Sequence, residues 1–292
     1  ADAERMIPST SSISLTLENM YTETKLSFLP EDATGDVMYI DDELQGEKET
    51  IKASKVLDLF RTNPNQHVKI ETWNNMPTAA GLSSSSSGLS ALVKAANELF
   101  QVGKTQSELA QIAKFASGSS SRSFFGPLAA WDKDSGDVYQ VETDLKLAMI
   151  MLVLTDQKKP VSSRDGMKLC TETSTSFPDW IKQSEQDYKD MLGYLKANDF
   201  QAVGELTEAN ALRMHQTTST ANPPFSYLTD ASYQAMDKVK ALRASGERCY
   251  FTMDAGPNVK VLCLEEDLDR LADHFRKDYQ VIVSRTKELP DA

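Results

Sequence analysis

Short strands and long helices follow one another along this chain in an order that limits the folds open to it. Alternation of apolar and polar residues with period two predicts strands at Ile13–Leu17 and His67–Glu71. Helical spacing of apolar residues follows over 84–101 and 105–117. The second helix opens with Thr105 and has Glu108 in its first turn, the pattern of a capping box. Strands therefore precede the first long helices.

The second half of the chain is rich in helices. Regular apolar positions predict helices at 179–196, 199–214, 228–244 and 266–277. Strands are predicted at 249–253, 259–264 and 279–284. Gly246 closes the third of these helices, and the turn Asp254–Asn258 joins the first two strands. This order predicts an α+β fold without the parallel repeat of a Rossmann domain.

A polar stretch near the middle of the chain divides it. The 292 residues are enough for two domains of ordinary size. The chain turns polar around Trp131–Gly136 and then gives a strand near Val138–Val141 and an apolar strand at 147–154. We therefore predict one domain over residues 1–145 and a second over residues 146–292.

The charge and the apolar runs exclude several classes of partner. A formal net charge of −12 argues against a nucleic-acid binder or a binder of anionic membranes, because either needs a basic face. The longest apolar run, Leu147–Leu154, has the length of a buried strand and not the roughly 20 residues of a membrane helix. An anionic small molecule remains compatible with the sequence, since it needs only a local positive pocket.

The cysteines and histidines predict neither a disulfide framework nor a zinc site. Cys170, Cys249 and Cys263 are odd in number and widely spaced, which fits a reducing cytoplasm. The histidines at 67, 215 and 274 are too scattered for a metal cluster. The polar opening residues 1–5 contain neither an apolar signal core nor an initiator methionine, which is compatible with a start inside a longer gene product.

A run of small residues, Pro77–Gly88, is the strongest chemical signal and lies between a strand and a helix. Small side chains let backbone N–H groups approach an anion, serine hydroxyls add donors, and the helix N-terminus adds positive potential. A solvated serine-rich linker is the alternative, but linkers seldom precede an apolar helix such as Leu89–Leu99. No Gly-Lys-Ser/Thr of a Walker loop follows. The run predicts a loop that cradles a triphosphate.

Two further segments carry groups suited to an active site, each with a plainer alternative. Ser117, Ser119 and Arg122 place a rigid guanidinium among hydroxyls, which suits a carboxylate or phosphate. By themselves these residues favour the plainer interpretation, a flexible turn with a surface arginine. Asp254 stands in an Asp-Ala-Gly-Pro turn, where an aspartate often only caps its own turn.

A third segment, Pro160–Met167, opens a helix after an apolar strand. Ser163 and Arg164 stand at its start, with Lys158 and Lys159 just ahead. Serine caps and free N–H groups offer a second anion site, which suits a diphosphate. An ordinary capped helix fits the same residues equally well.

These segments together resemble those of one known family. The residues Gly81, Leu82, Ser84 and Ser85 are similar to the second motif of the GHMP kinases, although Ser83 stands where glycine is common. Residues 116–126, 160–167 and 250–260 are similar to segments of the mevalonate diphosphate decarboxylases. The similarity extends over essentially the whole chain, including Thr10–Leu17 and Asn210–His215.

The resemblance implies a fold and a set of site residues. The fold would be the two-domain GHMP kinase fold, ribosomal protein S5 domain 2-like in the N-terminal half and ferredoxin-like in the C-terminal half, with the active site in the cleft between them. The ATP phosphates would be bound by Gly81, Leu82, Ser83, Ser84, Ser85, Ser86 and Ser87. The substrate would be bound by Ser117, Ser119, Arg122, Ser163 and Arg164. Asp254 and Arg122 would be catalytic.

The resemblance also implies a reaction, namely ATP-dependent decarboxylation of mevalonate 5-diphosphate to isopentenyl diphosphate. Asp254 would orient the 3-hydroxyl and accept its proton late, because phosphoryl transfer gains more from positioning than from early deprotonation. Magnesium would arrive with ATP, and no protein side chain is assigned to it. The resemblance also implies that two copies of the chain form a homodimer. The alternatives are a mevalonate or phosphomevalonate kinase and a non-catalytic GHMP-fold protein that binds an anionic metabolite.

One departure from the family pattern concerns the start of the chain. Family members begin with a strand carrying an Ala-x-Ile-Lys-Tyr-Trp-Gly-Lys-like segment, whose tyrosine and lysine help to hold the substrate. The present sequence starts just beyond it, so the resemblance predicts an incomplete site. We expect the difference to reflect where the given sequence begins and not a natural loss.

Overall fold

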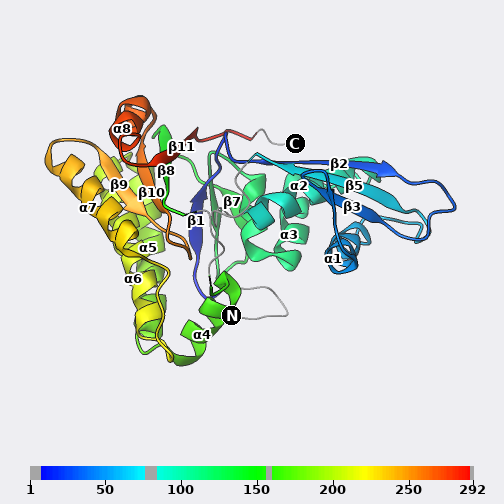
Figure 1. Ribbon diagram of the computed structural model, residues 1–292, viewed down its shortest axis with the longest axis horizontal. Helices are drawn as coiled ribbons and strands as arrows, with labels where there is room; N and C mark the ends of the chain where they lie inside the picture. Colours follow the sequence, from blue (N-terminus) through cyan, green and yellow to red (C-terminus); the bar gives the residue numbers. More distant parts are fainter. Residues whose placement is uncertain (1–7, 76–83, 156–159, 290–292) are drawn as a thin grey trace.

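The computed structural model describes residues 8–75, 84–155 and 160–289, which form two lobes joined at a small central sheet (Figure 1). Three sheets carry the architecture. One belongs to the N-terminal lobe, one to the C-terminal lobe, and the third lies between them. Strands and helices are mixed without a repeated parallel unit, so the predicted α+β class is confirmed.

The N-terminal lobe is a four-stranded sheet with helices packed on it. The strand order is β2-β5-β3-β4, with β3 and β5 parallel and the other pairs antiparallel. Helices α1 and α2 contact the sheet and α3 packs on α2, around the fully buried Val68 and Ile70 of β5. The elements are β2 (Thr22–Phe28), β3 (Val37–Ile40), β4 (Glu43–Leu44), α1 (Glu47–Leu57), β5 (Val68–Asn74), α2 (Ser84–Leu99) and α3 (Gln106–Ala116).

The central sheet has three strands, with β1 at one edge. Its order is β1-β6-β7, all antiparallel. A 3-10 segment, η1, connects α3 to β6 and packs on α2. A side chain at Gly118 would come within 2.5 Å of the Trp131 ring, so η1 lies directly on the sheet. The elements are β1 (Ser12–Leu15), η1 (Gly118–Phe124), β6 (Leu128–Trp131) and β7 (Val138–Gln140).

The C-terminal lobe is an antiparallel sheet of order β11-β8-β10-β9 with helices on both faces. The apolar run predicted as a buried strand forms β8, whose alternate residues enter two cores. Helices α7 and α8 cover one core, and α5 with the start of α6 covers the other. The elements are β8 (Leu147–Val153), α4 (Ser163–Thr173), α5 (Phe177–Lys196), α6 (Phe200–Ser219), α7 (Asp230–Ala244), β9 (Cys249–Thr252), β10 (Val259–Leu264), η2 (Glu265–Asp267), α8 (Leu268–Phe275) and β11 (Gln280–Arg285).

Local signals located most of these elements, and the differences have physical causes. The Thr105 and Glu108 capping box is present, and Gly246 adopts φ +104 just after α7. Helix α1 was not predicted, because it buries only three side chains and its apolar stripe is narrow. The acidic run at 265–267 includes the buried Asp267, which pairs with Arg248 and Arg270.

None of the helices in the described ranges combines the length and the apolar character needed to cross a bilayer.

Candidate active site

A cavity of about 600 Å³ lies where elements of both lobes converge. Its walls come from β1, the start of α2, η1, and the strands β8, β9 and β10. Much of the lining is apolar, with methionines and leucines of the C-terminal lobe. The polar and charged members include Ser86, Ser87, Ser119, Arg122, Ser123, Asp254 and Lys260. The cavity therefore combines an apolar wall with a concentrated set of hydroxyls and charges.

The serine-rich segment reaches this cavity through the first turns of α2. Ser86 and Ser87 line the cavity, and the Oγ atoms of Ser86 and Ser119 lie 2.5 Å apart. The Ser90 hydroxyl donates to the carbonyls of Ser86 and Ser120, at 2.8 and 2.9 Å. These bonds fix the N-terminal end of a long helix beside η1, so the positive end of its dipole faces the cavity.

Part of the predicted phosphate loop lies outside the described residues. Gly81, Leu82 and Ser83 fall in the range 76–83. Ser84 and Ser85 begin the backbone of α2, and their side chains are likewise outside the description. Of the seven predicted phosphate-binding residues, the structure places Ser86 and Ser87 in the cavity wall.

Arg122 is held in the cavity by the edge strand β1. Its Nε donates to Ser14 Oγ at 3.0 Å and its Nη1 donates to Ser12 Oγ at 2.6 Å. Among the described residues no acceptor faces Nη2, so that end of the guanidinium remains available to a ligand. Period-two alternation of β1 puts both serines on one face. The sequence predicted this strand but gave no indication that its serines contact Arg122.

Asp254 follows β9, and its carboxylate opens into the cavity with 60% of the side chain exposed. Its Oδ2 forms an ion pair with Lys260 Nζ, and Lys260 is the largest influence that lowers the pKa of Asp254. Desolvation opposes this effect, while the charge of Arg122 and, when it is protonated, that of His215 add to it. The carboxylate is therefore ionised at neutral pH, and it does not cap its own turn.

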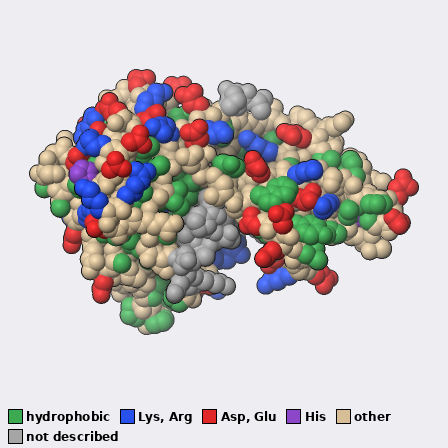
Figure 2. All heavy atoms as spheres, turned by 45° about the horizontal axis from the view of Figure 1, so that its top comes forward, with side chains coloured by type: hydrophobic (Ala, Val, Ile, Leu, Met, Phe, Trp, Pro, Cys, Tyr) green, Lys and Arg blue, Asp and Glu red, His purple; other side chains and the backbone are tan. Residues whose placement is uncertain are grey.

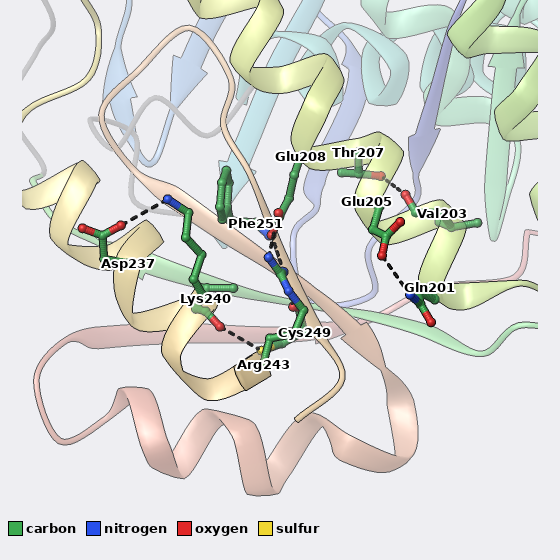
Figure 3. Close-up of polar contacts among 11 residues, drawn as sticks. Gln201, Val203, Glu205, Thr207, Glu208, Asp237, Lys240, Arg243, Cys249 and Phe251 are labelled. Atoms are coloured by element: carbon green, nitrogen blue, oxygen red, sulfur yellow. Dashed lines mark hydrogen bonds and ion pairs between the residues drawn. The ribbon is translucent and has the colours of Figure 1, made fainter. Parts of the chain in front are cut away.

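A network outside the cavity anchors β9, the strand that precedes Asp254 (Figure 3). The Arg243 guanidinium donates to both oxygens of Glu208, at 2.6 and 3.0 Å, and to the carbonyl of Cys249 at 2.9 Å. The backbone N–H of Phe251 also donates to Glu208, at 3.0 Å. Since Glu208 lies on α6 and Arg243 on α7, these bonds tie β9 to both helices.

The anchor predicts a stability difference between two glutamates of α6. Glu208→Ala should lower the free energy of unfolding by roughly 2 kcal/mol, because it leaves the half-buried Arg243 and the Phe251 N–H without their acceptor. Glu205→Ala is the matched control, since Glu205 is exposed and accepts a hydrogen bond from Gln201 of the same helix, and it should change stability by less than about 0.5 kcal/mol. Urea unfolding measures both, and equal effects would contradict the anchoring role.

Three predicted substrate residues lie away from the cavity wall. Ser117 ends α3, with its Oγ 3.4 Å from Ser119 Oγ, and it does not line the cavity. Ser163 and Arg164 begin α4, and no described residue of α4 lines the cavity. Lys158 and Lys159 lie outside the described residues.

The start of α4 is nevertheless a fixed structure. The Ser162 hydroxyl accepts from the Asp165 N–H at 3.1 Å as the N-cap. The Tyr227 hydroxyl donates to the Ser162 carbonyl at 3.0 Å. A side chain at Gly166 would come within 2.1 Å of the Tyr227 hydroxyl, so Gly166 is required for this approach. The N-terminal end of α4 is thus held in place by a tyrosine from the loop before α7.

The arrangement favours an anionic ligand with a hydroxyl to be activated. Arg122, Lys260 and a helix N-terminus gather positive charge in one cavity of a chain whose net charge is −12. Asp254, kept ionised among them, can orient a hydroxyl and accept its proton. Among the described residues no group of three or more His, Cys, Asp or Glu could hold a metal ion. Hydroxyl and carboxylate oxygens suit magnesium that is held mainly by phosphates and water.

Comparison with known families covers nearly the whole chain. Residues 1–141 match the family model described as diphosphomevalonate decarboxylase-like N-terminal domain, and residues 149–290 match the mevalonate 5-diphosphate decarboxylase C-terminal domain. The diphosphomevalonate decarboxylase of Gibberella zeae is 30% identical over 96% of this chain and 80% of its own length. The Candida albicans diphosphomevalonate decarboxylase is 32% identical over 70% of this chain and 60% of its own length.

Solved structures give the same relationship. The mevalonate pyrophosphate decarboxylase of Streptococcus pyogenes is 67% identical and superposes with a TM-score of 0.97, over 100% of this chain and 92% of that one. A structure described as MDDEF in complex with MVAPP, AMPPCP and magnesium is 40% identical, with a TM-score of 0.89 over 99% of this chain and 91% of that one. These likenesses extend through both lobes.

Proposed function

The chain belongs to the mevalonate diphosphate decarboxylase family, and from this membership we propose that it catalyses the ATP-dependent decarboxylation of mevalonate 5-diphosphate. Its fold is that of the GHMP kinases, with ATP and magnesium as cofactors. The kinase and binding-protein alternatives are not favoured, because the matches in both lobes are to decarboxylases. The observation that carries the proposal is the cavity in which Ser86, Arg122 and Asp254 meet.

The proposed reaction converts the 3-hydroxyl of the substrate into a good leaving group. A 3-hydroxy acid loses carbon dioxide readily only when its hydroxyl can depart. The γ-phosphoryl group of ATP is transferred to the 3-oxygen, and the hydroxyl proton passes to a base. The C–O bond then breaks with release of phosphate, while the electrons of the bond to the carboxylate form the new double bond. The products are isopentenyl diphosphate, carbon dioxide, phosphate and ADP.

Asp254 is the proposed base in this scheme. It orients the 3-hydroxyl and takes its proton late in phosphoryl transfer, for which an ionised carboxylate is required. Support comes from its exposure to the cavity and from the cation beside it, which keeps the pKa low. Arg122 binds the substrate carboxylate through the free end of its guanidinium, with Ser119 as a neighbouring donor. Fixing that carboxylate keeps the two breaking bonds aligned.

The ATP phosphates are assigned to residues 81–87 at the start of α2. Support comes from Ser86 and Ser87 in the cavity wall and from the helix N-terminus behind them. Magnesium, when bound with ATP, neutralises the charge that develops on the transferred phosphoryl group. Ser117, Ser163 and Arg164 are assigned to the substrate from family resemblance. Ser163 and Arg164 do not line the cavity, so they can contact the substrate only if it extends beyond the lining residues or if α4 moves toward the cavity.

One assay tests the proposed reaction. The protein is supplied with ATP, magnesium and mevalonate 5-diphosphate, and carbon dioxide, phosphate and isopentenyl diphosphate are followed together. Equal amounts of all three are expected. A phosphorylated product without carbon dioxide would instead indicate a kinase, and no turnover at all would indicate a binding protein.

We further propose the setting in which the enzyme works. It binds a small-molecule substrate in the cytoplasm as a homodimer, and its domains divide at residues 145 and 146. Three buried free cysteines fit a reducing compartment. Sedimentation analysis of the purified protein tests the dimer, for which a monomer mass at micromolar concentration would be the contrary result.

A further inference from the structure

Lys260 occupies an unusual place for a charged side chain. It is the second residue of β10, between Val259 and Val261, which are fully buried in the core of the C-terminal lobe. Strand alternation therefore turns Lys260 toward the opposite face, where its cross-strand neighbours are Met151 and Thr252. Both neighbours line the cavity, and the Lys260 side chain is 13% exposed.

The lysine ends at the proposed base. Its Nζ forms an ion pair with Oδ2 of Asp254, and among the described residues no donor faces Oδ1. Strands β9 and β10 pair antiparallel, with Lys260 opposite Thr252, and Asp254 lies two residues after Thr252 in the turn that joins the strands, so the hairpin brings the lysine and the carboxylate together. One carboxylate oxygen is thereby fixed, and the other stays open to the cavity.

We propose that Lys260 is a positioning residue of the decarboxylation reaction, which holds the Asp254 carboxylate so that its second oxygen faces the substrate hydroxyl. The inference rests on the proposed function, since it assigns Lys260 a role only through Asp254. It goes beyond the site predicted from the sequence, which assigned a role to Asp254 but none to Lys260.

An ordinary stabilising ion pair does not account for this placement. Dehydrating a lysine in a wall with Met151 and Leu262 opposes folding, and an apolar residue there would pack at lower cost. The chain also contains many exposed pairs that need no such burial, among them Lys240 with Asp237. A buried cation that meets a carboxylate at a cavity wall is more typical of a functional site.

The other cations near Asp254 cannot replace Lys260. Arg122 approaches from η1, but two of its donors are already engaged by Ser12 and Ser14. His215 approaches from α6, and burial lowers its pKa, so it is mainly neutral at neutral pH. Of the three, Lys260 is the cation in direct contact with the carboxylate.

The first test is Lys260→Met in the full chain, assayed by carbon dioxide release. Loss of the positioning cation should lower kcat about 10- to 100-fold, with the KM for ATP nearly unchanged. The acid limb of the kcat profile should move to higher pH, because the pKa of Asp254 rises when the opposite charge is removed. Lys260→Arg keeps the charge and should restore most of the rate and the original limb.

A double-mutant cycle separates positioning from mere stability. In an Asp254→Asn background, Lys260→Met should lower kcat less than twofold further, because the group through which it acts is already inactive. Lys240→Met is the matched control, since it breaks an exposed Lys-Asp pair away from the cavity (Figure 3) and should leave kcat and its pH profile unchanged. Should Lys260→Met fail to fold, Lys260→Gln takes its place in the same cycle.

The contrary outcomes are distinct. Wild-type kcat and pH profile in Lys260→Met, or effects that multiply in the double variant, would overturn the positioning role while leaving the proposed reaction intact. A wild-type enzyme that releases no carbon dioxide would overturn both the reaction and this role.

Discussion

Asp254→Asn is expected to lower turnover by roughly two to four orders of magnitude, the range that general acid–base catalysis supplies. Asparagine has nearly the size of aspartate and can still accept a hydrogen bond from a hydroxyl, but it cannot take the proton. The KM values for ATP and for mevalonate 5-diphosphate should therefore change little. Carbon dioxide release under single-turnover conditions measures the effect, since product release does not then limit the rate.

The same substitution should change the pH dependence. Lys260 holds the pKa of Asp254 below its ordinary value of 3.8, so in the wild type the ionised form persists down to acidic pH and activity is lost as pH falls through the lowered pKa. The residual rate of Asp254→Asn should lack that limb. Asp237→Asn is a matched control, because Asp237 is an exposed carboxylate on α7 that also pairs with a lysine. Turnover of Asp254→Asn equal to that of Asp237→Asn would exclude Asp254 as the base.

Charge placement explains why such a site can exist in an acidic protein. Acidic and basic side chains are interspersed over the face shown in Figure 2, and no continuous basic surface stands out on it. The two cations of the proposed site instead line the cavity, with Arg122 on η1 and Lys260 on β10. A net charge of −12 therefore argues against a broad basic surface but places no limit on a local positive pocket.

Local patterns in the sequence predicted much of the fold because local physics decides those elements. The apolar run at 147–154 becomes β8, buried on both faces, and the Thr105 and Glu108 pattern becomes a capping box. The paired strands around Asp254 were likewise predicted, since turn residues mark the hairpin. Helix α1 was missed because a stripe of three buried residues scarcely differs from a polar loop.

Long-range contacts within the site could not be predicted in the same way. Ser12 and Ser14 hold Arg122 from 110 and 108 residues away, and nothing in β1 indicates which segment its polar face will meet. Lys260 was visible in the sequence beside Asp254, yet its direction depends on the register of β10 with β8 and β9. These side chains reach the site because of the way distant strands pair and pack, which residue type alone does not reveal.

Arg122→Ala is expected to lower kcat/KM for mevalonate 5-diphosphate by roughly two to three orders of magnitude, comparable to the loss of a strong charged donor from an active site. The guanidinium is the proposed partner of the substrate carboxylate, and alanine cannot form that contact. The KM for ATP should be nearly unchanged, because Ser86 and Ser87 belong to α2 and keep their place when the Arg122 side chain of η1 is removed. Circular dichroism and thermal unfolding should show an intact fold, since Arg122 contacts β1 only through two hydroxyls.

Graded variants separate the charge of Arg122 from its orientation. Lys at position 122 keeps a positive charge but loses the planar fork, so Arg122→Lys should recover only part of the rate. Ser12→Ala combined with Ser14→Ala leaves the guanidinium present but unheld, and kcat/KM should fall about tenfold because the contact must then be ordered on binding. A near-normal rate in Arg122→Ala would make Arg122 a structural arginine, and normal activity of the serine pair would show that β1 does not orient it.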